Sequence, residues 1–192
     1  MKRLNDSNTE ESVKAICVAM LNYGAEVQVK FGYNLGQMAN SELSPEQKVV
    51  PGAEEMNFSK TNTIPTSPFK PADGLSLGEI VYMQFNLKDT TYNLKDHKVG
   101  YSVNGGEETI IPYEKFTHND AYGRTIFSIP VLAKYVRQEH AITIYNAAGE
   151  VVYTGMLYSV EGTASKYVGS TSEAVFLALM AYGDAVSVKF PV

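Results

Sequence analysis

The sequence contains one cysteine, no tryptophan and no stripe of basic residues. A single cysteine, Cys17, excludes an intramolecular disulfide and a cysteine-cluster metal site, and we expect it to be a small buried hydrophobe. The net charge of -5, with both signs interspersed, leaves no basic stripe for a phosphate backbone, so we expect no nucleic-acid binding. No apolar run is long enough for membrane insertion.

The first six residues contain two basic residues and no apolar segment after them, which is unlike a signal peptide. Two interpretations follow: a cytoplasmic protein, or a fragment excised from a longer exported one.

Patterns that carry catalysis or metal binding are also missing. His97, His118 and His140 are far apart and have no helical ligand partner, and there is no Gly-x-Ser-x-Gly nucleophile elbow. The segment 117–123 lacks the alternating acids and the terminal Glu of a calcium loop. We therefore expect no enzyme, no metal and no cofactor.

Two acid pairs, Glu54-Glu55 and Glu107-Glu108, are each adjacent in the sequence. A glycosidase pair needs carboxylates opposed across a cleft, so solvated loop charges are the better interpretation. Asn104-Gly105-Gly106 lacks the lysine of a phosphate-binding loop and is instead typical of a hairpin turn.

Helices are predicted near both ends of the chain. Apolar residues recur at spacings of three and four over residues 10–31, with Thr9 or Ser12 as the cap and Gly32 as the stop. A short helix over 159–168 and a longer one over 172–189 are predicted at the other end.

Between the helices, proline and polar residues dominate first, and then apolar residues alternate with period two. The stretch 44–74 contains five prolines and predicts a linker or a loop that wraps the surface. Strands are predicted over 80–87, 99–103, 109–116, 124–129, 141–146 and 151–157. Pro130 to Tyr135 predicts one short helical turn.

One helix is present twice. Residues 15–31 and 174–190 align without gaps, offset by 159 positions. The identical pairs are Ala15/Ala174, Ala19/Ala178, Tyr23/Tyr182, Gly24/Gly183, Val27/Val186, Val29/Val188, Lys30/Lys189 and Phe31/Phe190. Glycine inside a helix costs about 1 kcal/mol relative to alanine, so its repetition predicts that a backbone approaches there. We interpret Tyr23, Gly24, Tyr182 and Gly183 as packing residues and not as ligand contacts.

The first copy carries a family resemblance. Met20-Leu21-Asn22-Tyr23-Gly24-Ala25-Glu26-Val27-Gln28, then Phe31-Gly32-Tyr33-Asn34 and Met38-Ala39-Asn40, resembles a module repeated in secreted and surface-anchored proteins of gut Clostridia. The family pattern has small residues where this chain has Glu26 and Val27, and Leu where it has Met38. The resemblance implies an extracellular or wall-associated accessory module with neighbouring repeat units, without known catalytic residues. In that family the helix closes a unit.

The sequence thus predicts an α+β fold: an antiparallel, immunoglobulin-like β-sandwich with amphipathic helices that pack on the sheet or on each other. Its segments are 1–43, the closing helix of a repeat unit; 44–74, the proline-rich stretch; and 75–192, the sandwich with its C-terminal helices. We expect them to form one folded unit overall.

Three functions stay open at this point. The first is an adhesion module of a bacterial surface protein that binds a host protein, with immunoglobulin as one target. The second is a carbohydrate-binding module, although the chain lacks the Trp that often forms its aromatic platform. The third is a structural spacer in a tandem surface array. The candidate ligand contacts are Tyr92, Tyr113 and Tyr122.

Overall fold

A computed structural model of the chain describes residue 4 and residues 6–65, 70–78, 80–88, 97–115, 117–119 and 124–192. The chain forms two compact units that interleave along the sequence. The first, which we call the helical unit, comprises residues 1–59, 132–137 and 161–192. The second, which we call the sheet unit, comprises residues 60–131 and 138–160. The stretch 44–74 is therefore divided between the units, and the long C-terminal helix belongs to a different unit from the described strands.

The helical elements are α1 (Glu11–Phe31), η1 (Glu46–Lys48), η2 (Tyr113–Lys115), η4 (Ala133–Tyr135), α2 (Val160–Ala164), η5 (Ser165–Tyr167) and α3 (Glu173–Lys189), where η denotes a 3-10 turn. The strands are β1 (Lys70–Ser76), β2 (Val81–Lys88), β3 (Lys98–Val103), β4 (Thr109–Pro112), β5 (Thr117–Asn119), β6 (Arg124–Val131), β7 (His140–Tyr145) and β8 (Val151–Tyr158). Among the described residues, no helix combines the length and apolar character that crossing a membrane requires.

The predicted long helices are confirmed to within one residue at each end. Gly32 ends α1 in the left-handed conformation (φ 66°), where an L side chain would be strained. The prediction of Gly32 as the helix stop is confirmed. The prediction of a Thr9 or Ser12 cap is wrong. Glu10 occupies the cap position and makes no side-chain capping hydrogen bond. Cys17 is half-buried, so the expectation of a buried thiol is met only in part.

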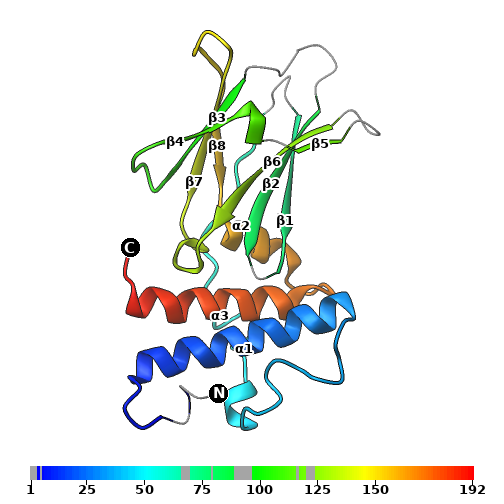
Figure 1. Cartoon of the computed structure of the whole chain (residues 1–192), viewed down its shortest axis with the longest axis vertical. Coiled ribbons are helices and arrows are strands. Elements are labelled where there is room, and N and C mark those ends of the chain that lie inside the picture. The colour runs from blue at the N-terminus through cyan, green and yellow to red at the C-terminus, as the bar shows by residue number, and fades with distance from the viewer. Residues whose placement is uncertain are drawn as a thin grey trace. The chain divides into compact units, whose positions relative to one another are not determined.

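The sheet unit contains two antiparallel four-stranded sheets, with strand orders β1-β2-β6-β5 and β4-β3-β7-β8 (Figure 1). The predicted hairpin turn joins β3 to β4: Asn104 and Gly105 both have positive φ, and the Gly106 amide donates to the Val103 carbonyl over 2.9 Å. Strand β1 begins inside the stretch predicted to lack regular structure. Pro71 is accommodated because β1 is an edge strand, where a missing N–H leaves no interior ladder bond unmade.

Aromatic side chains fill the space between the two sheets. Phe85 of β2 stacks on Phe127 of β6 within one sheet, and it meets Tyr158 of β8 in the other sheet edge to face, with ring centroids 5.3 Å apart. All three rings are nearly inaccessible to solvent. The predicted α+β class is confirmed, and the two sheets are consistent with a β-sandwich.

One edge of the β4-β3-β7-β8 sheet is paired with an extended segment of the same unit. Thr63 exchanges two backbone hydrogen bonds with Leu157 of β8, at 2.8 and 2.9 Å. The Asn62 side chain accepts the Ser159 amide, and the Tyr153 hydroxyl donates to the Pro65 carbonyl. This part of the proline-rich stretch thus protects an edge strand from pairing with another chain.

In the helical unit, α1 and α3 run antiparallel side by side, so the helices pack on each other (Figure 1). The stacked rings at this contact are Tyr23 and Tyr182, with centroids 6.3 Å apart and planes 9° from parallel. These two tyrosines are equivalent positions of the repeat. Two antiparallel copies that meet at equivalent residues are related by an approximate twofold axis, which here passes between the two rings.

The repeated glycines lie where another segment of the helical unit comes close. A Cβ on Gly183 would collide with the Val136 side chain and stand 2.9 Å from the Ala133 carbonyl oxygen. A Cβ on Gly24 would stand 3.1 Å from the Ala39 Cβ. The expected close approach of a backbone is therefore found at Gly183. At Gly24 the group that comes close is the Ala39 side chain.

These two glycines predict a matched pair of stability effects. Gly183→Ala should lower the free energy of unfolding by about 1–3 kcal/mol, because the added methyl overpacks against η4. Gly24→Ala should change it by less than about 1 kcal/mol, because higher helix propensity offsets a milder contact. Urea unfolding followed by circular dichroism measures both. Equal effects would contradict the assigned close approach at Gly183.

Candidate functional site

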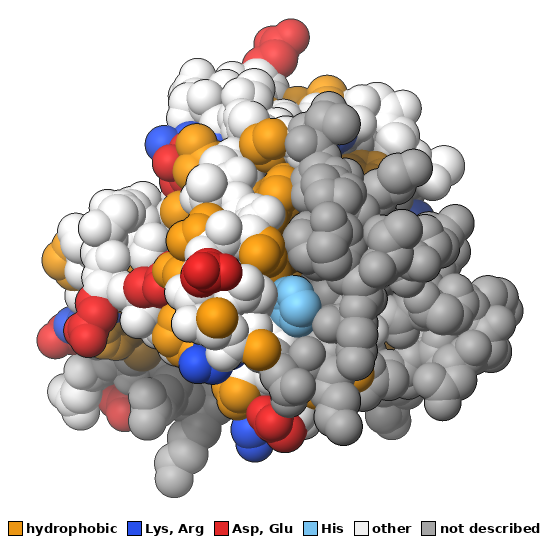
Figure 2. All heavy atoms as spheres, turned by 90° about the horizontal axis from the view of Figure 1, so that it is seen from above, with side chains coloured by type: hydrophobic (Ala, Val, Ile, Leu, Met, Phe, Trp, Pro, Cys, Tyr) orange, Lys and Arg blue, Asp and Glu red, His pale blue; other side chains and the backbone are white. Residues whose placement is uncertain are grey.

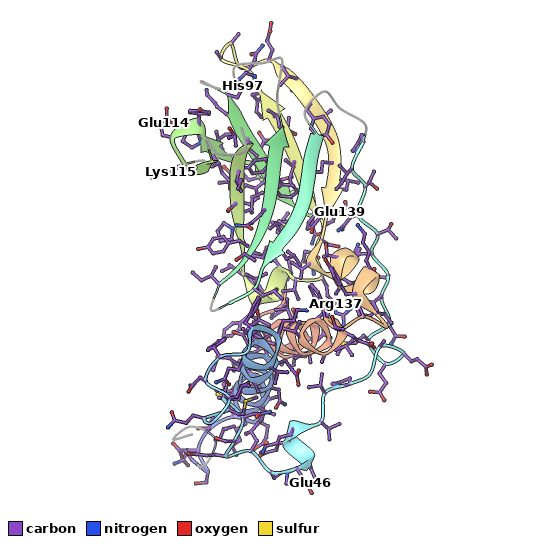
Figure 3. All side chains as sticks on the ribbon, turned by 90° about the vertical axis from the view of Figure 1, so that its right-hand side faces the viewer. Glu46, His97, Glu114, Lys115, Arg137 and Glu139 are labelled. Atoms are coloured by element: carbon purple, nitrogen blue, oxygen red, sulfur yellow. The ribbon has the colours of Figure 1, made fainter. Side chains whose placement is uncertain are left out.

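Of the three tyrosines predicted as ligand contacts, Tyr113 is the one that lies among the described residues. Tyr92 and Tyr122 lie outside the described residues. Tyr113 opens the turn η2 directly after β4 and is half-buried. Its neighbours Glu114 and Lys115 project from the outer side of the sheet unit in Figure 3, and His97 lies toward the end of that unit.

The polar residues of the family-like motif bind the chain that follows α1. Asn22 is buried, and its side-chain amide donates a hydrogen bond to the Gln47 carbonyl over 2.8 Å. Its side-chain oxygen accepts a hydrogen bond from the Asn40 side-chain amide. Gln28, also buried, donates to the carbonyls of Asn34 and Gln37, and it accepts the Ala39 amide over 2.6 Å. These contacts satisfy buried polar atoms and hold the returning loop on α1.

A group of charges lies inside the helical unit, around Arg137 (Figure 3). The guanidinium donates twice to Asp184, over 2.5 and 2.7 Å, and lies 3.5 Å from a carboxylate oxygen of Glu161. Glu161 is 1% exposed, and its other oxygen accepts the amide and the hydroxyl of Ser59. Hydrogen bonding to Asp184 raises the pKa of Arg137 above its ordinary value, against an opposing effect of burial.

This network holds four separate segments together, and each carboxylate already has partners. A buried carboxylate without a counter-charge is costly, so the arrangement favours structure over chemistry. Within the described ranges, no group of three or more His, Cys, Asp or Glu side chains is placed to hold a metal ion.

A different arrangement lies on the solvent side of the β4-β3-β7-β8 sheet. Side chains of a strand alternate between faces, and Val99, Ile142 and Ile144 are buried on the inner side. The opposite face carries a row of four paired residues, one from each strand: Pro112, Lys98, Tyr145 and Val151. A neighbouring row pairs Ile110, Gly100 and Thr143. We call this surface the outer sheet face.

Glu108 lies across the middle of the outer sheet face. Its carboxylate occupies the space that a Cβ on Gly100 would need, with one oxygen 2.8 Å from that position. The Tyr145 hydroxyl donates to the Glu108 carboxylate over 2.7 Å. Glycine at position 100 therefore lets an acidic side chain from the β3–β4 connection reach the tyrosine. Of the two acid pairs interpreted as solvated loop charges, Glu107-Glu108 thus supplies a specific contact.

Apolar and polar groups are mixed on this face. Ile110 is 46% exposed and Val151 is 54% exposed, with Lys98 and the Glu108–Tyr145 pair between them. The end of the molecule drawn in Figure 2 likewise shows hydrophobic side chains interspersed with charges of both signs. Period-two alternation could have identified the strands, but not Glu108, because its partner Tyr145 is distant in the sequence and reached only through the register.

Comparisons with known proteins return no match: no protein-family model, no curated protein and no solved structure matches this chain.

Loss of Arg137 should destabilise the helical unit. Arg137→Ala should lower the free energy of unfolding by about 3–5 kcal/mol, because it leaves the Glu161 carboxylate buried without its cation. Lys134→Ala, in the same segment, removes a cation that lies over the Tyr135 ring and should cost less than about 1 kcal/mol. Chemical denaturation compares the two variants, and losses of similar size would contradict the assigned role of Arg137.

The Glu108–Tyr145 contact should be visible in a titration. Hydrogen bonding to Glu108, followed by burial and by the Glu108 charge, raises the pKa of Tyr145 above its ordinary value of 10.0, while Thr143 lowers it. Ionisation of the phenol would place a second negative charge beside the carboxylate. Glu108→Gln should therefore lower the Tyr145 pKa. Tyrosine ring carbon NMR, assigned with Tyr145→Phe, measures it, and an unchanged or higher value would contradict the contact.

Proposed function

We propose that this chain is a non-catalytic recognition module of a bacterial cell-surface protein, which binds a host protein through the outer sheet face. The observation that carries the proposal is the composition of that face. Exposed aliphatic side chains surround a tyrosine that is fixed by a carboxylate, with a lysine beside it. Tyrosine combines a large apolar ring with a polar tip, and it is enriched where proteins bind one another.

We also propose that the sheet unit has an immunoglobulin-like fold, and the strand order supports this. The order β1-β2-β6-β5 corresponds to strands A-B-E-D of an immunoglobulin domain. The order β4-β3-β7-β8 corresponds to C-F-G with one further strand beside C. The outer sheet face is then the solvent side of the C-F-G sheet. The resemblance of the α1 motif to modules of gut bacterial surface proteins supports a host partner and an extracellular location.

Preorganisation is the physical reason for choosing the outer sheet face over the loops. Tyr145 lies on a strand that is paired on both sides, and its hydroxyl is already bonded to Glu108. A side chain fixed in this way loses little conformational entropy when a partner covers it. The Glu108–Tyr145 pair offers the partner a carboxylate edge together with an aromatic ring.

The test is binding of the full chain to purified secretory immunoglobulin A and, in parallel, to mucin glycans. We expect saturable binding to the immunoglobulin, and Tyr145→Ala should weaken it at least about tenfold, as loss of a central aromatic contact does. Tyr33→Ala is the matched control, because Tyr33 is 51% exposed in the helical unit and should leave affinity unchanged.

Circular dichroism confirms that both variants stay folded. The host-protein proposal would be refuted if the chain does not bind immunoglobulin and captures no protein from mucosal secretions. Binding to glycans alone, lost in Tyr145→Ala, would replace it with carbohydrate recognition. Equal loss in Tyr33→Ala would refute the assignment to the outer sheet face.

A further inference from the structure

The Glu108 carboxylate has a defined position on the outer sheet face and still has capacity to bind another group. Residue 108 is exposed, although its carboxylate reaches back over β3 to the place where Gly100 leaves space. The Tyr145 hydroxyl donates to its oxygen Oε2. An ionised carboxylate has about four sites that accept hydrogen bonds, so a single phenol leaves most of them open.

No cation among the described residues forms an ion pair with this carboxylate. The ion pairs that these residues make join other groups: Lys14 with Glu11, Arg137 with Glu161 and Asp184, and Lys189 with Glu10. Lys98 is exposed and pairs with Tyr145 across β3 and β7, yet it takes part in none of them. Within the described part of the chain, Glu108 is thus held by a neutral donor, and no ion pair balances its charge.

Glycine at position 100 keeps this carboxylate beside the tyrosine. A Cβ on Gly100 would collide with the Glu108 carboxylate, which therefore lies against the backbone of β3. The phenol bond and this close contact together hold a negative charge next to an aromatic ring. A partner side chain that contacts both groups meets them already arranged, so little conformational entropy is lost on binding.

We propose that the partner of the outer sheet face presents an arginine, whose guanidinium binds the Glu108 carboxylate and lies against the Tyr145 ring. This inference rests on the proposed function, because it names the group by which the bound protein is recognised. A guanidinium donates through a planar fork that matches a carboxylate, and it also stacks on aromatic faces. A lysine ammonium is a compact, strongly hydrated charge without a planar face, so arginine fits the pair better.

The surroundings of the pair suit a long side chain with an apolar stem. Ile110 pairs with Gly100, Val151 pairs with Tyr145, and both aliphatic side chains are exposed. The methylene groups of an arginine cover such side chains while its charged head reaches the carboxylate. Lys98 lies in the same row as Tyr145 and repels further cations. The partner is therefore expected to bring one arginine to this place and not a basic patch.

The test combines a variant of this chain with a chemical change in the partner. Secretory immunoglobulin A is used untreated, with its arginines blocked by phenylglyoxal, and with its lysines acetylated. For the untreated form, Glu108→Gln should weaken binding about tenfold, because it removes the charge but keeps an oxygen for the Tyr145 hydroxyl. Arginine-blocked immunoglobulin should bind the parent chain and Glu108→Gln equally weakly, since groups in contact are not additive. The lysine-acetylated form should preserve the difference between them.

Glu107→Gln is the matched control. Glu107 is exposed and belongs to the same acid pair, whereas the contact with Tyr145 is made by Glu108. The control removes the same charge one residue away, so it should bind untreated immunoglobulin like the parent chain. Gly100→Ala keeps the Glu108 charge but displaces the carboxylate, and it should weaken binding as Glu108→Gln does. Circular dichroism checks that each variant and each treated immunoglobulin is folded.

The outcomes separate this inference from the proposed function. If Tyr145→Ala weakens binding and Glu108→Gln does not, the arginine contact is refuted and recognition through the outer sheet face stands. The same conclusion follows if the effect of Glu108→Gln persists with blocked arginines, disappears with acetylated lysines, or is equalled by Glu107→Gln. A parent chain that binds no secreted protein refutes the proposed function, and this inference with it. If the chain captures another secreted protein instead, the same treatments are applied to that protein.

Discussion

The helical unit depends on the burial of α3. Residues 175–180 are apolar in every direction, so this helix is stable in water only when other segments surround it. The helix α1 covers one side, η5 contributes the ring of Tyr167, and η4 packs against Gly183. These covers come from the beginning, the middle and the end of the chain. The interleaving of the two units follows from this requirement, because the segment between β6 and β7 leaves the sheet unit to pack on α3.

The charge network around Arg137 joins the same segments that bury α3. The turn that packs on Gly183 is followed at once by Arg137, which brings a guanidinium to Asp184 of α3 and to Glu161 of α2. Glu161 in turn fixes the backbone of Ser59. A buried carboxylate is tolerated because a cation and two hydrogen-bond donors share its oxygens. The segments brought together by apolar burial are thus also joined by specific polar contacts.

Much of the architecture could be predicted because its signals are local. The long helices follow from apolar spacing, Gly32 from the need for a left-handed stop, and Asn104-Gly105 from two positive φ angles. The failures are contacts between residues distant in sequence. Ser59 and Glu161 are separated by 102 positions, and Glu108 meets Tyr145 only through the strand register. Strand β1 was hidden by Pro71, since proline argues against a strand unless its place at an edge is known.

The two copies of the repeated helix differ where their surroundings differ. Asn22 and Gln28 hold a loop on α1, and their counterparts in α3 are Ala181 and Ser187. Ser187 keeps one such bond, to the Lys134 carbonyl of the segment that covers α3. The shared Tyr23 and Tyr182 meet where the two helices pair. The differing Gln28 and Ser187 each hold the segment that their own helix receives.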